Sequence, residues 1–206
     1  MIERTNYLNQ LIDFKDQKLI KIVTGIRRCG KSTLFDIYIN YLKENGIKEK
    51  QIIKINLENP EYNFNDYMEL YNYIKKKLVK DKMNYVFIDE VQTVEKFQKA
   101  VDGLFIMENV DLYITGSNAY LLSGELATLL SGRYVEIKML PLSFKEYLSA
   151  FDDKENLESK FLYYLKYGSF PQTIELFKRA PNTINSYLDG VFSTVVYKDI
   201  MMRNKI

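Results

Sequence analysis

Eight consecutive residues near the N-terminus combine two glycines, a lysine and a hydroxyl side chain at a set spacing. They read Gly25-Ile26-Arg27-Arg28-Cys29-Gly30-Lys31-Ser32, are followed by Thr33, and match the pattern G-x-x-x-x-G-K-[ST]. Glycine at both ends lets successive backbone N–H groups turn inward around phosphate oxygens, and a helix that starts here points its positive end at the same place. The pattern therefore predicts a phosphate-binding loop over residues 25–33.

The side chains of this loop suggest how a nucleotide would be held. Lys31 can reach the β and γ phosphates, and the Ser32 hydroxyl can serve as a ligand of Mg²⁺. Arg27 and Arg28 could contact phosphate or a partner, and they also suit plain solvent exposure. An incidental glycine turn is the alternative for the whole pattern. The position directly between a predicted strand and a predicted helix favours the phosphate loop.

Two carboxylates follow an apolar strand further along the chain. Asp89 and Glu90 come directly after Tyr85-Val86-Phe87-Ile88. Asp89 suits a magnesium ion, usually held through water, and Glu90 suits a general base that polarises an attacking water. An ordinary acidic turn is the alternative, but the phosphate loop upstream favours the functional interpretation. A glutamate right after the aspartate favours a hydrolase over a kinase.

A third polar group, Thr115-Gly116-Ser117-Asn118, follows the next predicted strand. A polar side chain at this place can contact the γ phosphate or orient the attacking water. Ser117 and Asn118 are both candidates, and the sequence does not choose between them. A Gly-Ser-Asn turn or a helix N-cap is the structural alternative.

The composition excludes several other kinds of chemistry. The 206 residues include no His, so Ser-His-Asp triads, Cys-His dyads and His-ligated metals are ruled out. Cys29 is the single cysteine and cannot close an internal disulfide, so a reducing compartment is expected. Lys and Arg number 29 against 27 Asp and Glu, which gives no global field to attract nucleic acid or anionic lipid.

Short apolar runs alternate with stretches of helical period, which is the pattern of a parallel sheet covered by helices. Strands are predicted at 19–24, 51–57, 84–88, 110–115 and 134–140. Helices are predicted at 67–80, at 94–107 and at 31–42, the last with Leu34, Ile37, Tyr38 and Tyr41 on one face. The sequence thus predicts an α/β fold in which helices flank a five-stranded, mainly parallel sheet.

The pattern changes after Pro141, where no further strand is evident and the helices are broken at Gly168 and at Phe170-Pro171. We predict a P-loop core over residues 1–141, and over 142–206 a small helical lid with the start of a truncated or absent C-terminal domain. The last helix is predicted to begin after Asn182 as N-cap, and it carries Ile184, Leu188, Val191 and Val195 at helical spacing. Its apolar residues on both sides suggest that it needs a partner surface.

In combination these motifs resemble those of the archaeal and bacterial AAA-type P-loop ATPases. The residues that carry the resemblance are the phosphate loop (Walker A), strand-Asp89-Glu90-Val91-Gln92 (Walker B), Thr115 to Asn118, Ser131-Gly132-Arg133 and Leu140-Pro141-Leu142-Ser143-Phe144. The resemblance covers about residues 4–200 and implies kinship in core architecture with replication-initiator and signal-transduction ATPases. Members of this family typically continue into a second, C-terminal domain, which leaves the biological role more open than the ATPase chemistry.

The resemblance also suggests roles for two arginines. In AAA-type proteins an arginine just before the fifth strand often projects into a neighbouring subunit's site as an arginine finger, and Arg133 precedes the predicted strand 134–140. A surface arginine after a helix C-terminus explains it equally well. Similar proteins carry an Arg-x-x-Tyr pair like Arg4 and Tyr7 on the first predicted helix, either at the adenine end of the site or as a solvated charge and a core ring.

These observations predict a cytoplasmic, magnesium-dependent ATPase with ATP and Mg²⁺ as cofactors. It is expected to form a homo-oligomer with Arg133 acting in trans, to have an unidentified protein partner, and to have no membrane span. A nucleotide-controlled switch or docking module with little turnover is one alternative, and a DNA-associated ATPase is another. Binding of nucleic acid is suggested by the family resemblance alone. The basic cluster Lys75-Lys76-Lys77 with Lys80 and Lys82 does not require it, because a solvated helix face explains these lysines.

Overall fold

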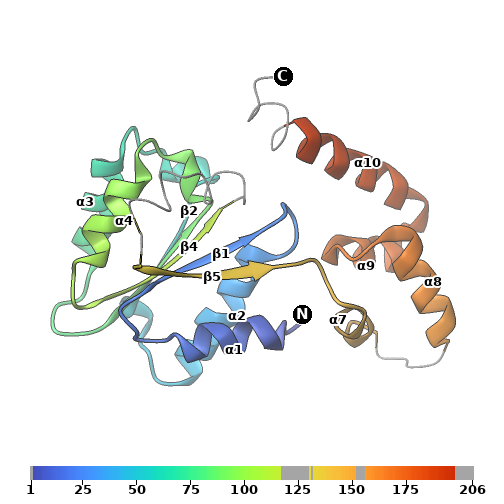
Figure 1. Ribbon diagram of the computed structural model, residues 1–206, viewed down its shortest axis with the longest axis horizontal. Coiled ribbons are helices and arrows are strands. Elements are labelled where there is room, and N and C mark those ends of the chain that lie inside the picture. The colour runs from blue at the N-terminus through green and yellow to red at the C-terminus, as the bar shows by residue number, and fades with distance from the viewer. Residues whose placement is uncertain (1, 117–129, 131, 152–155, 198–206) are drawn as a thin grey trace. The chain divides into compact units, whose positions relative to one another are not determined.

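The computed structural model describes residues 2–116, 130, 132–151 and 156–197 (Figure 1). Its contacts divide the chain into two units. The sheet unit comprises residues 5–25 and 31–138, and the helical unit comprises residues 1–4, 26–30 and 139–206. The assignment of residues 142–206 as a lid stays a prediction. Within the described ranges, no helix is both long and apolar enough to cross a membrane.

The predicted five-stranded sheet is confirmed. Its strands are β1 (Ile20–Gly25), β2 (Ile52–Asn56), β3 (Asn84–Asp89), β4 (Val110–Gly116) and β5 (Tyr134–Met139). The spatial order is β2-β3-β4-β1-β5, and the pairs β2–β3, β3–β4 and β4–β1 are parallel. Figure 1 shows β5 pointing the same way as β1. The carboxyl ends of β1 and β3 therefore lie at one edge of the sheet, on either side of β4.

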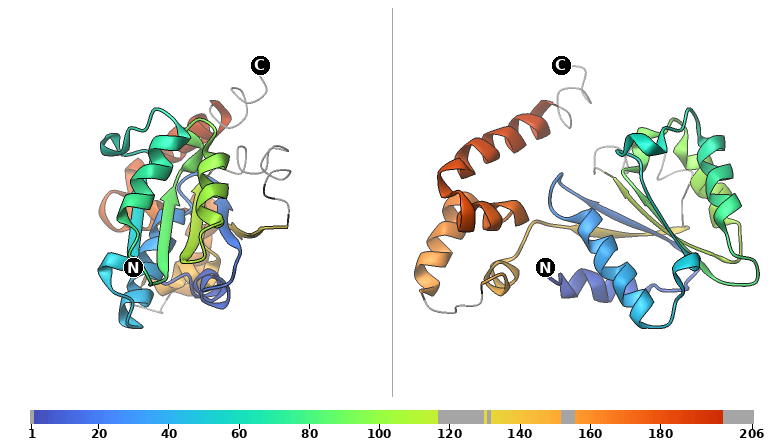
Figure 2. Two further views of the ribbon diagram at one scale, coloured as in Figure 1. Left: turned by 90° about the vertical axis from the view of Figure 1, so that its left-hand side faces the viewer. Right: turned by 180° about the vertical axis from the view of Figure 1, so that it is seen from behind.

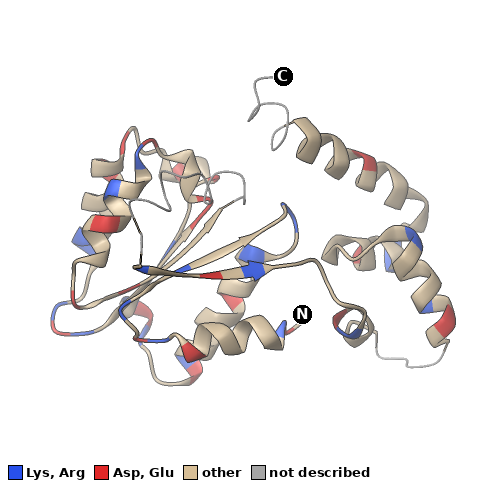
Figure 3. Ribbon diagram, in the orientation of Figure 1, with Lys and Arg blue, Asp and Glu red and all other residues tan. Residues whose placement is uncertain are grey.

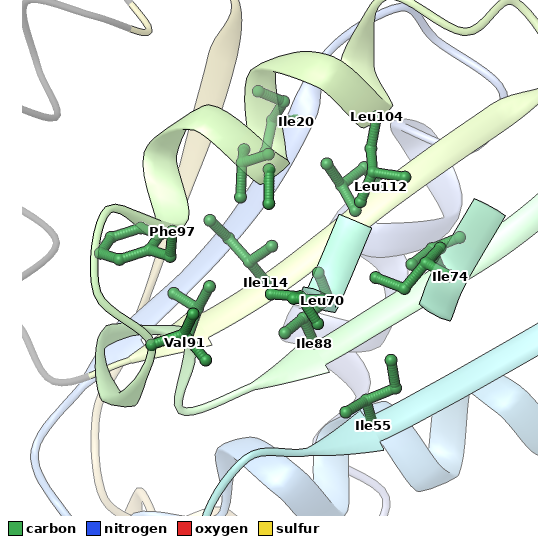
Figure 4. Close-up of a cluster of buried hydrophobic side chains, with 14 of the residues drawn as sticks. Ile20, Ile55, Leu70, Ile74, Ile88, Val91, Phe97, Leu104, Leu112 and Ile114 are labelled. Carbon is green, nitrogen blue, oxygen red and sulfur yellow. The ribbon is translucent and has the colours of Figure 1, made fainter. Parts of the chain in front are cut away.

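Helices cover both faces of this sheet (Figures 1 and 2). They are α1 (Thr5–Asp13), α2 (Lys31–Glu44), α3 (Tyr67–Lys77) and α4 (Phe97–Phe105). Alternate residues of the strands, among them Ile22, Ile88 and Ile114, pack with α3 and α4 into the main core (Figure 4). The predicted helix 94–107 starts three residues late because Val94 is extended and Lys96 is left-handed.

The basic cluster Lys75-Lys76-Lys77 lies in the last turn of α3, where the negative end of the helix dipole favours cations. Figure 3 shows residues of both charge signs on α3 and α4. This placement agrees with the interpretation of the cluster as a solvated helix face.

The opposite face of the sheet is aromatic and carries a buried polar network. Phe87 and Tyr113 stack with ring centroids 4.7 Å apart, and the Tyr38 hydroxyl lies 2.9 Å from that of Tyr113. Tyr113 donates to Asp111 at 2.7 Å, and the fully buried Lys21 forms an ion pair with Asp111. The buried charges are thus paired and hydrogen-bonded, as burial requires.

The buried phenols make the fold sensitive to alkali. Burial raises the pKa of Tyr85 to about 12, and it also raises the pKa values of Tyr38 and Tyr113 above their usual value. Between pH 10 and 12 these three phenols ionise in the unfolded chain but keep their protons in the folded chain. The folded chain then binds more protons than the unfolded chain, so its stability falls as pH rises. We expect the free energy of unfolding, measured by urea denaturation followed by circular dichroism, to fall across this window.

Tyr85→Phe is the matched control, because it removes one phenol and keeps the ring. Its free energy of unfolding should fall less steeply with pH than that of the parent chain. Burial lowers the pKa of Lys21 from its usual 10.5. This shift makes stability rise with pH, but only below pH 10.5, where the lysine of the unfolded chain is still protonated. Equal slopes in the two chains would show that Tyr85 does not contribute.

The helical unit contains α7 (Phe144–Ser149), α8 (Leu157–Tyr167), α9 (Pro171–Arg179) and α10 (Ile184–Thr194). The breaks predicted at Gly168 and Phe170-Pro171 are confirmed, because α8 ends just before Gly168 and α9 begins at Pro171. Ser143 and Glu146 form a capping box at the start of α7. The predicted N-cap Asn182 is wrong, because Pro181–Thr183 forms a 3-10 turn that leads directly into α10.

Candidate nucleotide-binding site

The phosphate loop joins the end of β1 to the start of α2. Gly25 is the last residue of β1 and Lys31 is the first of α2, as the sequence predicted. Gly30 has φ +103°, a backbone conformation that residues with a side chain rarely adopt. This conformation explains why the second glycine of the pattern is needed. Ser32 and Thr33 are exposed on the first turn of the helix. The Ser32 hydroxyl is therefore accessible to a ligand.

Lys31 and Glu90 come together in the sheet unit. Lys31 is 4% exposed and Glu90 is 8% exposed, and Lys31 Nζ lies 3.8 Å from Glu90 Oε1. Lys31 Nζ also donates to the Gly25 carbonyl oxygen at 3.2 Å. The lysine predicted to bind phosphate thus lies beside the carboxylate predicted to act as a base, although 59 residues separate them in the sequence.

Asp89 presents one oxygen that is suited to a metal ion. The side chain is 1% exposed, and its Oδ1 accepts a hydrogen bond from the Thr115 hydroxyl. Its Oδ2 is buried and has no hydrogen-bond partner among the described residues. A buried carboxylate oxygen without a partner costs about 1–3 kcal/mol, and a hard cation that prefers oxygen ligands would offset this cost. The donor set of Asp89 and Ser32 therefore fits Mg²⁺.

Glu90 has a strained backbone conformation that its neighbours hold in place. Its φ of 54° and ψ of 50° are left-handed, which costs a non-glycine residue about 1–3 kcal/mol. The Glu90 N–H donates to Thr115 Oγ1 at 3.0 Å, and the Glu90 carbonyl accepts from Thr93 N at 3.2 Å and Thr93 Oγ1 at 3.1 Å. Gln92 Nε2 donates to Glu90 Oε2 at 2.6 Å.

The sequence does not predict a role for the three residues that make these contacts with Glu90. Thr115 and Gln92 stood inside recognised motifs, but no role was assigned to either, and Thr93 was not singled out. A polar residue at the end of a buried strand was the available signal for Thr115. The sequence does not show which residues Thr115 would contact, because this depends on β4 lying beside β3.

The chain matches a known protein family over a long continuous segment. The model of the AAA domain matches residues 17–148, which is more than half of the chain. The chain belongs to the AAA domain family. This result confirms the resemblance that the motifs indicated.

Two curated relatives of this AAA domain protein are longer. An uncharacterized protein of Haemophilus influenzae is 47% identical over 209 residues, which cover 98% of this chain and 51% of that protein. An uncharacterized protein of Methanocaldococcus jannaschii is 32% identical over 204 residues, which cover 91% of this chain and 43% of that protein. The chain thus spans about half the length of the curated relatives it matches.

Three solved structures illustrate the similarity in fold. ORC1 of Aeropyrum pernix in complex with DNA has a TM-score of 0.61 at 13% identity, covering 91% of this chain and 61% of that one. The Walker-type ATPase of Pyrococcus abyssi has a TM-score of 0.57 at 14% identity, covering 94% and 72%. AMPPCP-bound DnaA of Aquifex aeolicus has a TM-score of 0.55 at 16% identity, covering 99% and 66%. These similarities confirm the fold class.

The remaining candidate residues of this AAA domain are placed differently. Ser117 and Asn118 lie outside the described residues. Arg133 is 48% exposed and bonds to Asp102 of α4 at 2.5 Å. The Arg133 carbonyl accepts from the N–H of Ile20, the first residue of β1, at 2.8 Å. Arg133 therefore lies at the amino edge of the sheet, whereas the phosphate loop follows the carboxyl edge, so a single chain does not bring Arg133 to Lys31 and Glu90.

Two arginines of the helical unit contact neighbouring groups of that unit. Arg4 precedes α1 and is buried, so neither the helical position nor the solvated charge considered for it is correct. Its guanidinium donates to the Cys29 carbonyl at 3.0 Å, to the Leu140 carbonyl at 2.5 Å and to Glu146 at 2.9 Å. Arg28 lies 5.5 Å from the ring centre of Tyr187 in α10. The middle of the phosphate loop is thus linked to the helices by these two arginines.

Proposed function

We propose that this AAA domain binds ATP with Mg²⁺ and hydrolyses it. The observation that carries the proposal is the convergence of Lys31, Asp89 and Glu90 at the carboxyl edge of the sheet. A phosphate-binding lysine at a helix start and two carboxylates at a strand end are the parts that phosphoryl transfer to water requires.

Different residues of the site would bind the phosphates, hold the metal ion and activate the water. The loop N–H groups and Lys31 hold the phosphates, and Lys31 exchanges its contacts with Gly25 and Glu90 for phosphate oxygens. Ser32 and Asp89 would hold Mg²⁺, which supplies charge neutralisation on the phosphates. Glu90 accepts a proton from the attacking water once Lys31 has moved away from its Oε1, while Gln92 keeps Oε2 in place.

The first test is stabilisation of the fold by Mg·ATP. Ligand at about a hundred times its dissociation constant should add roughly 2.7 kcal/mol to the free energy of unfolding, because only the folded chain binds it. The shift would be measured by thermal denaturation followed by circular dichroism. Lys31→Ala should remove most of it, because this variant lacks the ammonium group that holds the phosphates.

Lys43→Ala is the control for that variant. Lys43 lies in the last turn of the same helix and pairs with Glu49 at the surface. Its removal should leave the nucleotide-induced shift unchanged. A parent chain whose melting temperature does not move in saturating Mg·ATP would refute nucleotide binding.

A nucleotide-controlled switch is the second candidate function, and the arginine contacts of the loop favour it. Arg4 and Arg28 link residues of the phosphate loop to α7 and α10 within the helical unit. A loop rearranged by phosphate would change these contacts. Hydrogen exchange of α10 that differs between the ATP and ADP forms, together with negligible turnover, would favour a switch over an enzyme.

A further inference from the structure

The hydroxyl of Thr115 contacts both carboxylate residues of the site. Thr115 is the penultimate residue of β4, is 0% exposed, and lies beside the end of β3. Its Oγ1 accepts from the Glu90 N–H at 3.0 Å and donates to Asp89 Oδ1. A single buried hydroxyl therefore joins two residues that are 25 and 26 positions away in the sequence.

The direction of these hydrogen bonds follows from the chemistry of the groups. A backbone N–H can only donate, so it occupies a lone pair of the threonine oxygen. The one hydroxyl proton is left for Asp89, whose ionised carboxylate can only accept. This bond turns Oδ1 toward β4 and leaves Oδ2 as the oxygen without a partner among the described residues.

The same hydroxyl also anchors the left-handed backbone of Glu90. The backbone conformation of a residue sets the direction in which its side chain leaves the chain, and here that direction brings Oε1 to 3.8 Å from Lys31 Nζ. Thr93 Oγ1 donates to the carbonyl of Glu90 at 3.1 Å. Thr115, by contrast, bonds to the carboxylate of Asp89 as well as to the backbone of Glu90.

We propose that Thr115 is a positioning residue that sets Asp89 for the metal ion and Glu90 for water activation. The proposal rests on the proposed function, since it assigns a task within the same ATP and Mg²⁺ site. It predicts that the hydroxyl group of residue 115 matters, rather than the size of the side chain.

Thr115→Ala and Thr115→Ser test the proposal as a pair, because their side chains differ by the hydroxyl only. The measurement is the dissociation constant of ADP with and without Mg²⁺, by isothermal titration calorimetry. Residues that orient metal ligands typically contribute 10- to 100-fold to metal affinity, so Thr115→Ala should lose about tenfold or more of the Mg²⁺-dependent gain. Thr115→Ser should keep it, and ADP affinity without Mg²⁺ should be unchanged in both.

Two further variants separate positioning from packing. Thr115→Val keeps the shape of threonine and should behave as Thr115→Ala does, in both the Mg²⁺-dependent gain and the turnover number. Thr93→Val should lower turnover and leave the Mg²⁺-dependent gain intact. If the valine variant at 115 fails to fold, the alanine and serine pair still decides the question, with metal-free ADP binding as the check of an intact site.

The outcomes distinguish this inference from the function on which it rests. Equal Mg²⁺-dependent gains in Thr115→Ala and Thr115→Ser, in a parent chain that binds Mg·ADP, would overturn the role of Thr115 and leave the site standing. A parent chain that binds no nucleotide would overturn the proposed function and this inference with it. The calorimetric measurement uses ADP, so it remains informative in a chain with slow turnover.

Discussion

Glu90→Gln is expected to lower ATP turnover about 10²- to 10⁴-fold while ATP binding persists. Glutamine has nearly the shape of glutamate, but its amide cannot take a proton from water. In the structure Glu90 is buried beside Lys31, and Gln92 and Thr115 hold its side chain and its backbone. The carboxylate that we propose as the base is thus held beside Lys31. Steady-state phosphate release and calorimetric ATP binding would measure the two effects.

Glu95→Gln is a matched control for this variant. Glu95 is exposed, forms an ion pair with Lys96, and lies five residues beyond Glu90 in the same connection between β3 and α4. The same chemical change at this position should leave turnover as it is. Full activity in Glu90→Gln would show that another group accepts the proton.

Arg133→Ala is expected to lower turnover by about 10³- to 10⁵-fold, the range for a cation that stabilises charge on the transferred phosphate. Arg133 lies at the amino edge of its own sheet, so any phosphate that it contacts would belong to the site of another chain. In the isolated chain its guanidinium bonds to Asp102, a contact that it would exchange for phosphate on assembly. Turnover per chain should therefore rise with protein concentration.

Mixing two inactive variants tests this arrangement directly. Arg133→Ala chains have an intact phosphate loop, and Lys31→Ala chains have an intact arginine, so the mixture should recover part of the activity. Asp102→Asn is the control, because it removes the negative charge that pairs with Arg133 and keeps the arginine itself, so it should not abolish turnover. Turnover that is independent of concentration and unaffected by Arg133→Ala would identify Arg133 as a surface residue paired with Asp102.

The phosphate loop was predictable because its determinants are contiguous. Nine consecutive residues, 25–33, carry the glycines, the lysine and the hydroxyl, and the structure places residues 26–30 between β1 and α2 as expected. The five strands were predictable for a similar reason, since each is a short apolar run between polar segments. The side of α2 that is buried was predicted only in part. The structure buries Leu34, Phe35, Tyr38, Ile39 and Leu42, whereas Ile37 and Tyr41 are half-buried.

The tertiary structure decided the contacts between residues that are distant in the sequence. The order β3-β4-β1 brings Thr115 to Asp89 and Glu90, and strand order cannot be read from runs of apolar residues. Lys21 is a charged residue in a strand and is typical of a surface position, but Asp111, 90 residues away, pairs with it in the core. Arg133 likewise finds Asp102 through the packing of α4 beside the sheet.

Local sequence patterns therefore determined which residues could bind phosphate and metal, because backbone conformation and side-chain chemistry are local properties. The folding of the sheet decided which of them meet. A hydrogen bond or ion pair needs its atoms within about 3–4 Å, and only tertiary packing brings separate strands and helices so close. The contact between Lys31 and Glu90 and the two hydrogen bonds of Thr115 arise in this way.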